Sequence, residues 1–127
     1  MRSLDTNVVL RYLLKDIPAQ HARAKKLFTK SPLYVSDVVV SEAAFVLEKA
    51  VGLERAKVAV LLRFLLATPG LIANDHILGE AVDLFEIRTA LSFVDCHAAI
   101  EAKIFGSNLY TFDKKLLHQG GHYVLEP

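Results

Sequence analysis

Short apolar runs alternate with longer segments of helical periodicity along the chain. The short runs, several of which contain β-branched or aromatic residues, are typical of strands; they are residues 1–4, 33–36, 71–73, 109–112 and 122–125. The longer segments repeat apolar residues every three or four positions, which predicts helices; they are residues 7–15, 18–30, 37–51, 54–67, 76–90, 94–105 and 113–118. Strands that alternate with helices predict an α/β fold, with a parallel sheet covered by helices on both faces.

The pattern predicts one domain over residues 1–127, because no repeat, low-complexity tract or linker interrupts it. A single cysteine, Cys96, excludes an internal disulfide and fits a reducing compartment. Asp5 and Asn7 interrupt the apolar N-terminal segment, and no apolar stretch reaches the length of about 18 residues that a membrane span needs. We therefore expect a soluble, cytoplasmic protein with no membrane association.

The charge balance and the apolar fraction of the chain limit the kinds of partner that it is expected to bind. The 15 Lys and Arg residues almost balance the 14 Asp and Glu residues, for a formal net charge of +1. A nucleic acid would therefore have to be recognised through local clusters rather than by a strongly basic domain. The apolar fraction of 53% is high for so small a soluble domain, which indicates that some apolar surface meets another chain.

Acidic residues stand where the predicted strands end. Asp5 follows the first strand, Asp113 follows the fourth, and Asp95 opens the helix that precedes the fourth. In an open parallel sheet, ligands bind in the crevice beyond these carboxyl ends. Each acid is also a favoured helix N-cap, worth about 1 kcal/mol, and Ser92-x-x-Asp95 matches a capping box. Taken singly, each acid fits either role, and Asp37 is interpreted as a cap alone.

Glu42 is interpreted differently because it falls within a predicted apolar stripe. Val39 and Glu42 share one face of the helix predicted over 37–51, whereas Glu48 can point to water. Burying a lone carboxylate costs on the order of several kcal/mol. Glu42 would then need a cation, a network of donors or a raised pKa. The structural alternatives are a side chain at the edge of the stripe, or an ion pair with Arg11 or Lys49.

If the strand ends converge, Asp5, Glu42, Asp95 and Asp113 share one crevice. Two carboxylates about 4 Å apart repel by roughly 4 kcal/mol at an effective dielectric constant of about 20. Four of them therefore require a cation if they are all to stay ionised. Oxygen ligands without a Cys-His spacing favour Mg²⁺ or Mn²⁺ over zinc. Such a site suits the hydrolysis of phosphodiester bonds.

Four segments taken in order resemble the PIN-domain family and, within it, the VapC-type toxins of bacterial toxin–antitoxin pairs. They are Asp5-Thr6-Asn7, VSDVVVSEAAFVL with Glu42, LSFVDCHAA with Asp95, and LYTFDKKL with Asp113. The resemblance spans essentially the whole chain, although the segment before Asp5 is slightly shorter than usual. It implies a three-layer α/β/α fold with a mostly parallel central sheet. It also implies a Mg²⁺- or Mn²⁺-dependent endoribonuclease that acts on RNA and is paired with a cognate antitoxin.

The resemblance also assigns roles by position. The acidic quartet of the family, which carries catalysis and metal binding, is matched by Asp5, Glu42, Asp95 and Asp113. The polar positions that orient a ligand or a water are matched by Thr6, Asn7 and Thr111.

Basic residues near these segments are candidate RNA contacts. Those closest to the acids are Arg11, Lys114 and Lys115, and a further basic cluster consists of Arg23, Lys25, Lys26 and Lys30. The structural alternative for each group is a solvated helix face.

The helix predicted over 54–67 is apolar on nearly every side. It is either a partner surface, for a homodimer, an antitoxin helix or both, or a helix packed centrally in the core.

Two alternative functions differ in how well the sequence fits them. A phospho-acceptor receiver domain does not fit, because Thr6 follows Asp5 where a second acid is needed and no lysine follows the last strand. The remaining alternative is a catalytically idle PIN-like scaffold that binds protein or RNA.

Cys96 is expected to be buried, and His97 is given no role.

Overall fold

The structure is a computed structural model that describes residues 2–30 and 32–127. The chain divides into two compact units, residues 1–75 and residues 76–127. Met1, which was predicted to open the first strand, lies outside the described residues. None of the described helices combines the length and the apolar character needed to cross a bilayer.

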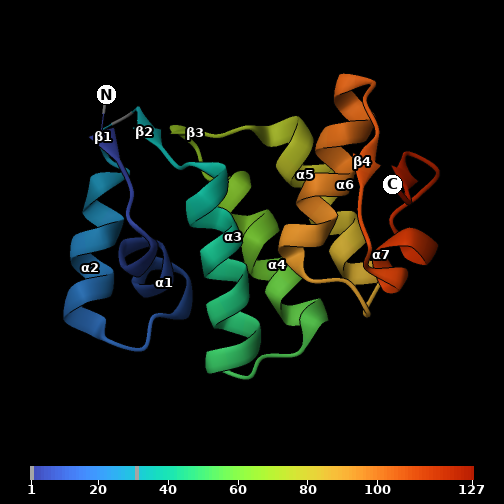
Figure 1. Cartoon of the computed structure of the whole chain (residues 1–127). Coiled ribbons are helices and arrows are strands. Elements are labelled where there is room, and N and C mark those ends of the chain that lie inside the picture. The colour runs from blue at the N-terminus through green and yellow to red at the C-terminus, as the bar shows by residue number, and fades with distance from the viewer. Residues whose placement is uncertain (1, 31) are drawn as a thin grey trace. The chain divides into compact units, whose positions relative to one another are not determined.

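The first unit alternates short strands with helices (Figure 1). Its elements are β1 (Arg2–Ser3), α1 (Thr6–Leu14), α2 (Pro18–Leu27), β2 (Leu33–Tyr34), α3 (Asp37–Phe45), the π-helical turn η1 (Val46–Ala50), α4 (Arg55–Leu66) and β3 (Leu71–Ile72). The strands form a parallel sheet in the order β1-β2-β3, in which Leu33 lies opposite both Arg2 and Leu71. α1 packs against α2 and α3, and α4 packs against α3 and η1.

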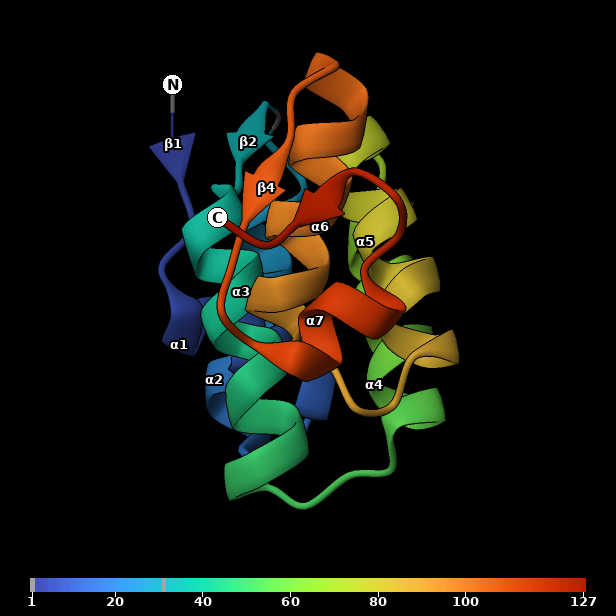
Figure 2. The ribbon, with the colours of Figure 1, turned by 45° about the vertical axis from the view of Figure 1, so that its right-hand side comes forward.

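The second unit contains one parallel strand pair and three helices among the described residues. Its elements are α5 (Asp75–Ile87), which begins one residue before the boundary, α6 (Phe93–Phe105), β4 (Leu109–Tyr110), α7 (Lys114–Gln119) and β5 (Val124–Leu125). Leu109 lies opposite Val124, and Figure 2 shows the two strands side by side. The predicted α/β fold with parallel strands is confirmed, although each strand is only two residues long.

Helix boundaries follow local chemistry. Pro18 occupies the first turn of α2, where its missing N–H costs nothing. The Ser36 hydroxyl caps α3 by accepting from the Val39 N–H at 3.2 Å. Gly106 ends α6 with φ +66°, a left-handed conformation that favours glycine. Each signal is local, which is why the sequence pattern located these ends to within a few residues.

The core contains mostly aliphatic side chains. In the first unit, Leu33 at the centre of the sheet and Leu47 and Leu62 on the helices around it are fully buried. In the second unit, the rings of Phe85 and Phe93 meet edge to face with centroids 5.7 Å apart. Cys96 is fully buried, as expected.

A charged cluster joins α5 to α6 in the second unit. Glu80 accepts a hydrogen bond from the Lys103 ammonium at 2.9 Å, and His76 Nε2 lies 2.9 Å from its other oxygen. The hydrogen bond from Lys103 holds the pKa of Glu80 below its ordinary value of 4.5. The ionised form of Glu80 is therefore the one that links the two helices.

We predict that Glu80→Gln lowers the stability of the protein above about pH 4.5 and has no effect in stronger acid. The folded-state pKa of Glu80 is depressed, so its contribution is present above the unfolded-state pKa and is lost as the pH falls through the folded-state pKa. The loss should be small because both partners are partly exposed. Urea midpoints at pH 7 and pH 3 measure it, with Glu126→Gln as the control for losing one exposed charge. Equal midpoints for Glu80→Gln and the wild type at pH 7 would contradict the prediction.

Candidate functional site

The three paired strands of the first unit bring polar residues to one edge of their sheet. Asp5 follows β1, Asp37 follows β2 and Asn74 follows β3. The Asn74 amide donates a hydrogen bond to the Asp37 carboxylate at 3.1 Å, so side chains from neighbouring strand ends contact each other. The sequence predicts Asp37 as a helix cap, but Ser36 occupies that position, and the pair with Asn74 was not predicted. The rule that parallel strands send their carboxyl ends to one edge was the signal that could have found it.

Asp5 occupies the N-cap position of α1, but its side chain makes no cap hydrogen bond. Only its backbone carbonyl takes part in the helix, by accepting from the Val9 N–H at 3.1 Å. Within residues 2–30 and 32–127, the exposed Asp5 carboxylate has no hydrogen-bond or ion-pair partner. Capping therefore does not account for the acid. Thr6 is buried at the start of the helix, and Asn7 is exposed.

Glu42 lies on the exposed face of α3, so the predicted apolar stripe was wrong. The buried face consists of Val40, Ala43, Ala44 and Leu47. These residues have the same i, i+3, i+4, i+7 spacing, displaced by one position, and the two alanines let α3 approach its neighbours closely. Burial does not constrain Glu42. Its carboxylate faces solvent and has no partner in the described part of the chain.

Glu48, which the sequence allows to point to water, is instead largely enclosed. Arg55 donates to it twice, from Nε at 2.8 Å and from Nη2 at 3.2 Å. The side chains of Glu48 and Arg55 are only 17% and 12% exposed. This bidentate pair ties η1 to the first turn of α4 and is structural. The π-helical turn, with its wider hydrogen bonds, changes the register of the side chains after Val46.

Neither predicted ion pair of Glu42 is present among the described residues. Arg11 instead binds Asp16, with Nη1 2.7 Å from Oδ2. Lys49 is highly exposed and lies 4.0 Å from Glu48.

Asp95 lies in the first turn of α6. Its backbone N–H donates to the Ser92 hydroxyl at 3.1 Å, which confirms the serine half of the predicted capping box. The half-buried Asp95 carboxylate accepts no hydrogen bond from any described residue. β4 packs against α6 and follows it after the turn at Gly106. The carboxyl end of β4, where Asp113 stands, therefore returns toward the end of α6 that carries Asp95.

Asp113 is held in place by its neighbours. Its Oδ1 atom caps α7 by accepting from the Lys115 N–H at 2.8 Å and from the Leu116 N–H at 3.2 Å. Its own N–H donates to the Thr111 hydroxyl at 3.0 Å. Both cap bonds use one oxygen, so Oδ2 is available to a ligand. Lys114 and Lys115 are exposed beside it.

The structure places two of the predicted acids in each unit. Asp5 and Glu42 belong to the first unit, and Asp95 and Asp113 belong to the second. The convergence of all four stays a prediction. Their chemistry fits a hard divalent cation, because each offers carboxylate oxygen and three of the four carboxylates have no partner among the described residues. Mg²⁺ or Mn²⁺ suits this donor set.

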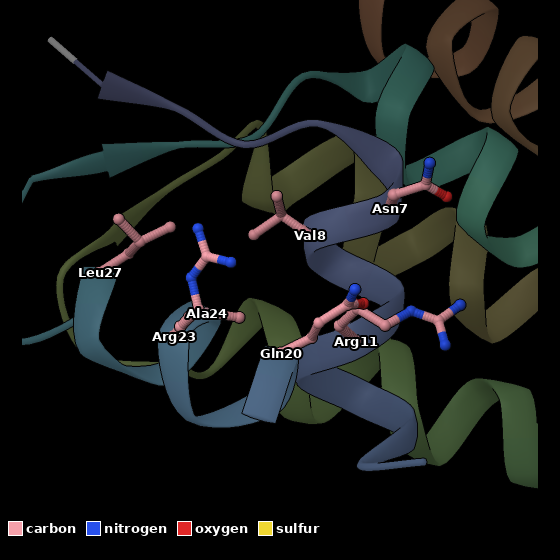
Figure 3. A pocket seen from close by; sticks show the side chains of 7 residues that line it. All are labelled: Asn7, Val8, Arg11, Gln20, Arg23, Ala24 and Leu27. Atoms are coloured by element: carbon pink, nitrogen blue, oxygen red, sulfur yellow. The ribbon is translucent and has the colours of Figure 1, made fainter. Parts of the chain in front are cut away.

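A groove between α1 and α2 lies next to Asn7 (Figure 3). It has a volume of about 360 Å³ and is lined by Asn7, Val8, Arg11, Gln20, Arg23, Ala24 and Leu27. The sequence predicts Arg11 as an RNA contact or a partner of Glu42, and Arg23 as part of a basic cluster. It had no signal for the groove, which depends on how the two helices pack.

We predict that Asp113→Ala costs about 1 kcal/mol of folding free energy, as the loss of a side-chain cap does. Asp113→Asn should cost less than half as much, because asparagine caps equally well. Asp5→Ala should also cost less, because no side-chain cap bond is lost there. Denaturant unfolding of the three variants measures these differences. An Asp5→Ala loss as large as that of Asp113→Ala would show that Asp5 is a structural cap.

Comparison with known proteins places these observations in a family. The sequence profile of the PIN domain matches residues 3–121. No curated protein matches the chain. PIN domains are generally nucleases and typically depend on divalent metal ions. Because the match covers almost the entire chain, this protein belongs to the PIN-domain family.

Proposed function

We propose that this protein is a Mg²⁺- or Mn²⁺-dependent endoribonuclease, and that its two units act together as one PIN domain. One observation carries the proposal. The carboxylates of Asp5, Glu42 and Asp95 have no partner within the described residues, and Asp113 engages only one oxygen. Glu48, by contrast, is fully engaged by an arginine. In a family of nucleases, acids whose carboxylate oxygens are unengaged are suited to bind metal.

The proposed chemistry divides among the four acids. A divalent ion held by Asp5, Glu42, Asp95 and Asp113 would supply an activated water and offset the negative charge of the reacting phosphate. One of these acids would orient or deprotonate the attacking water, and the others would act as ligands.

Neighbouring residues position the acids and the RNA. The Thr111 hydroxyl fixes the backbone of Asp113, and the two cap bonds orient its carboxylate. Thr6 and Asn7 would orient the ligands around Asp5, because Asn7 presents an exposed amide two residues from it. The exposed ammonium groups of Lys114 and Lys115 would contact RNA phosphates, since such contacts position a nucleic acid without reading its sequence.

The toxin role adds a protein partner, and α4 offers a surface for one. One face of α4, with Val58 and Leu62, is fully buried, while Val60 and Phe64 are 54% and 52% exposed. The buried face fits the prediction of a helix packed in the core, and the exposed face fits the prediction of a partner surface.

The exposed face of α4 borders an apolar groove of about 450 Å³ within the first unit. The groove is lined by Leu13, Leu14, Lys15, Leu53, Lys57, Val60, Leu61 and Phe64. We assign it to an amphipathic helix of a cognate antitoxin, whose acidic side chains would meet Lys15 and Lys57 at its rim. A homodimer in the cytoplasm stays part of the proposal.

We predict that the purified protein cleaves RNA only when Mg²⁺ or Mn²⁺ is present. Asp5→Asn should lower the rate at least about 100-fold, because even the outer partners of metal ligands contribute 10- to 100-fold. Glu54→Gln is the matched control, since Glu54 also holds an N-cap position without a side-chain cap bond. Cleavage that survives EDTA, or an unchanged rate for Asp5→Asn, would refute the proposal. Absence of Mn²⁺ binding in calorimetry would favour the idle scaffold.

We predict that Val60→Glu combined with Phe64→Glu abolishes co-purification with the protein encoded by the neighbouring reading frame. Two carboxylates in the apolar groove would lose their hydration on binding, at a cost on the order of several kcal/mol. Ile87→Glu, at another exposed apolar position, on α5, is the control. Undiminished recovery of the partner with the double variant would remove the groove from the proposal.

A further inference from the structure

The near-neutral net charge conceals a basic segment at the start of the chain. The first 30 residues contain seven Lys or Arg and two Asp, whereas the remaining residues contain eight Lys or Arg and twelve Asp or Glu. Within the basic segment, α2 carries Arg23, Lys25 and Lys26 and no acid. A helix with one sign of charge attracts an extended polyanion more than the total charge suggests.

The groove between α1 and α2 contains the guanidinium of Arg23, which no described residue neutralises. Figure 3 shows the Arg23 guanidinium in the space between Val8 and Leu27, while that of Arg11 extends away from it. Arg11 is engaged by Asp16, but Arg23 has no hydrogen-bond or ion-pair partner in residues 2–30 and 32–127.

A second guanidinium, that of Arg2, contacts the backbone of a residue that lines the groove. Arg2 donates from Nη2 to the Leu27 carbonyl at 3.2 Å, where α2 ends. Arg23 lines the groove together with the apolar side chains of Val8, Ala24 and Leu27, and Arg2 contacts the backbone of Leu27. The arrangement suits an anion, because guanidinium binds phosphate through two parallel hydrogen bonds and the apolar wall limits competition from water.

The groove reaches the first turn of α1, which directly follows Asp5. Asn7 belongs to its lining and is two residues from Asp5 on the first turn of α1. A ligand that reaches from Arg23 past Asn7 would therefore approach Asp5. The groove volume of about 360 Å³ falls at the lower end of the roughly 300–1,000 Å³ that small-molecule sites span, which suits one nucleotide.

We propose that the groove between α1 and α2 binds the phosphate backbone of single-stranded RNA beside the bond that is cleaved, with Arg23 as a phosphate contact. This inference rests on the proposed endoribonuclease function. RNA is favoured over an acidic protein segment because the groove leads to Asp5, where the proposed function requires a phosphodiester. Arg23 contributes to binding and to the register of the RNA, and it takes no part in the chemistry.

The test measures RNA binding separately from cleavage. Asp5→Asn protein with and without Arg23→Gln is titrated into fluorescently labelled single-stranded RNA at several salt concentrations. Arg23→Gln should weaken binding about three- to tenfold and flatten the salt dependence by about 0.7 in logarithmic slope, as expected for one lost phosphate contact on a single strand. Lys49→Gln, which removes an equal charge at a 63% exposed position on η1, should change neither quantity. Arg23→Lys, which keeps the charge but loses the paired hydrogen bonds, should fall between.

Equal effects of Arg23→Gln and Lys49→Gln would overturn the inference. It would also be overturned if Arg23→Gln kept its RNA affinity but lost binding to a labelled Glu-rich peptide, since the occupant would then be an acidic protein. In the cleavage assay, Arg23→Gln alone should raise KM and leave kcat within about twofold, because a contact made equally in ground and transition states changes binding only. A wild-type protein that binds RNA through Arg23 and cleaves none would support the groove and overturn the nuclease function.

Discussion

Parallel pairing of β1, β2 and β3 is the constraint from which the polar edge of the first unit follows. Neighbouring parallel strands cannot be joined by a tight turn, so each must be followed by a helical connection that starts at the same edge. Asp5, Asp37 and Asn74 stand at those starts. The strands are two residues long and contribute few ladder hydrogen bonds, so the packing of α1 on α2 and α3 must maintain their register. The helices thus support the sheet, and the sheet aligns the polar residues.

The two N-cap acids show that an acid at an N-cap position does not always cap its helix with its side chain. Asp5 and Asp113 both precede a helix in extended backbone conformation, and sequence alone treats them alike. One carboxylate oxygen of Asp113 accepts hydrogen bonds from two backbone N–H groups, whereas the Asp5 carboxylate accepts none from its helix. Some acids at N-cap positions accept no hydrogen bond from the backbone N–H groups of their helix. Such an acid is a stronger indication of a metal ligand than an acid that caps.

The elements could be predicted because their signals are local: Pro18 at a helix start, Gly106 at a helix end, and apolar runs between them. The buried face of α3 could not be predicted in this way. Its sequence contains two apolar stripes displaced by one residue, and only packing against neighbouring helices selects between them. The partner of Glu48 was equally inaccessible, because Arg55 reaches it across a loop. The sequence predicts the candidate site as a set of residues, and that assignment stays a prediction. The α1–α2 groove, which depends on helix packing, was not predicted.

Acid clusters and RNA pose a shared electrostatic problem, because unengaged carboxylates repel the phosphates that the site must receive. A divalent cation offsets that repulsion only within a few ångströms, since exposed charges are screened over about 8 Å at physiological salt. Under the proposed function the chain needs positive charge along the path of the RNA as well, and Arg23 on α2 would supply it in the unit that also holds Asp5. On this view the balanced total charge combines a basic N-terminal segment, which the proposal assigns to RNA, with two kinds of acid: those paired with cations, such as Glu48 and Glu80, and those proposed to bind a metal. Composition alone could not separate the two.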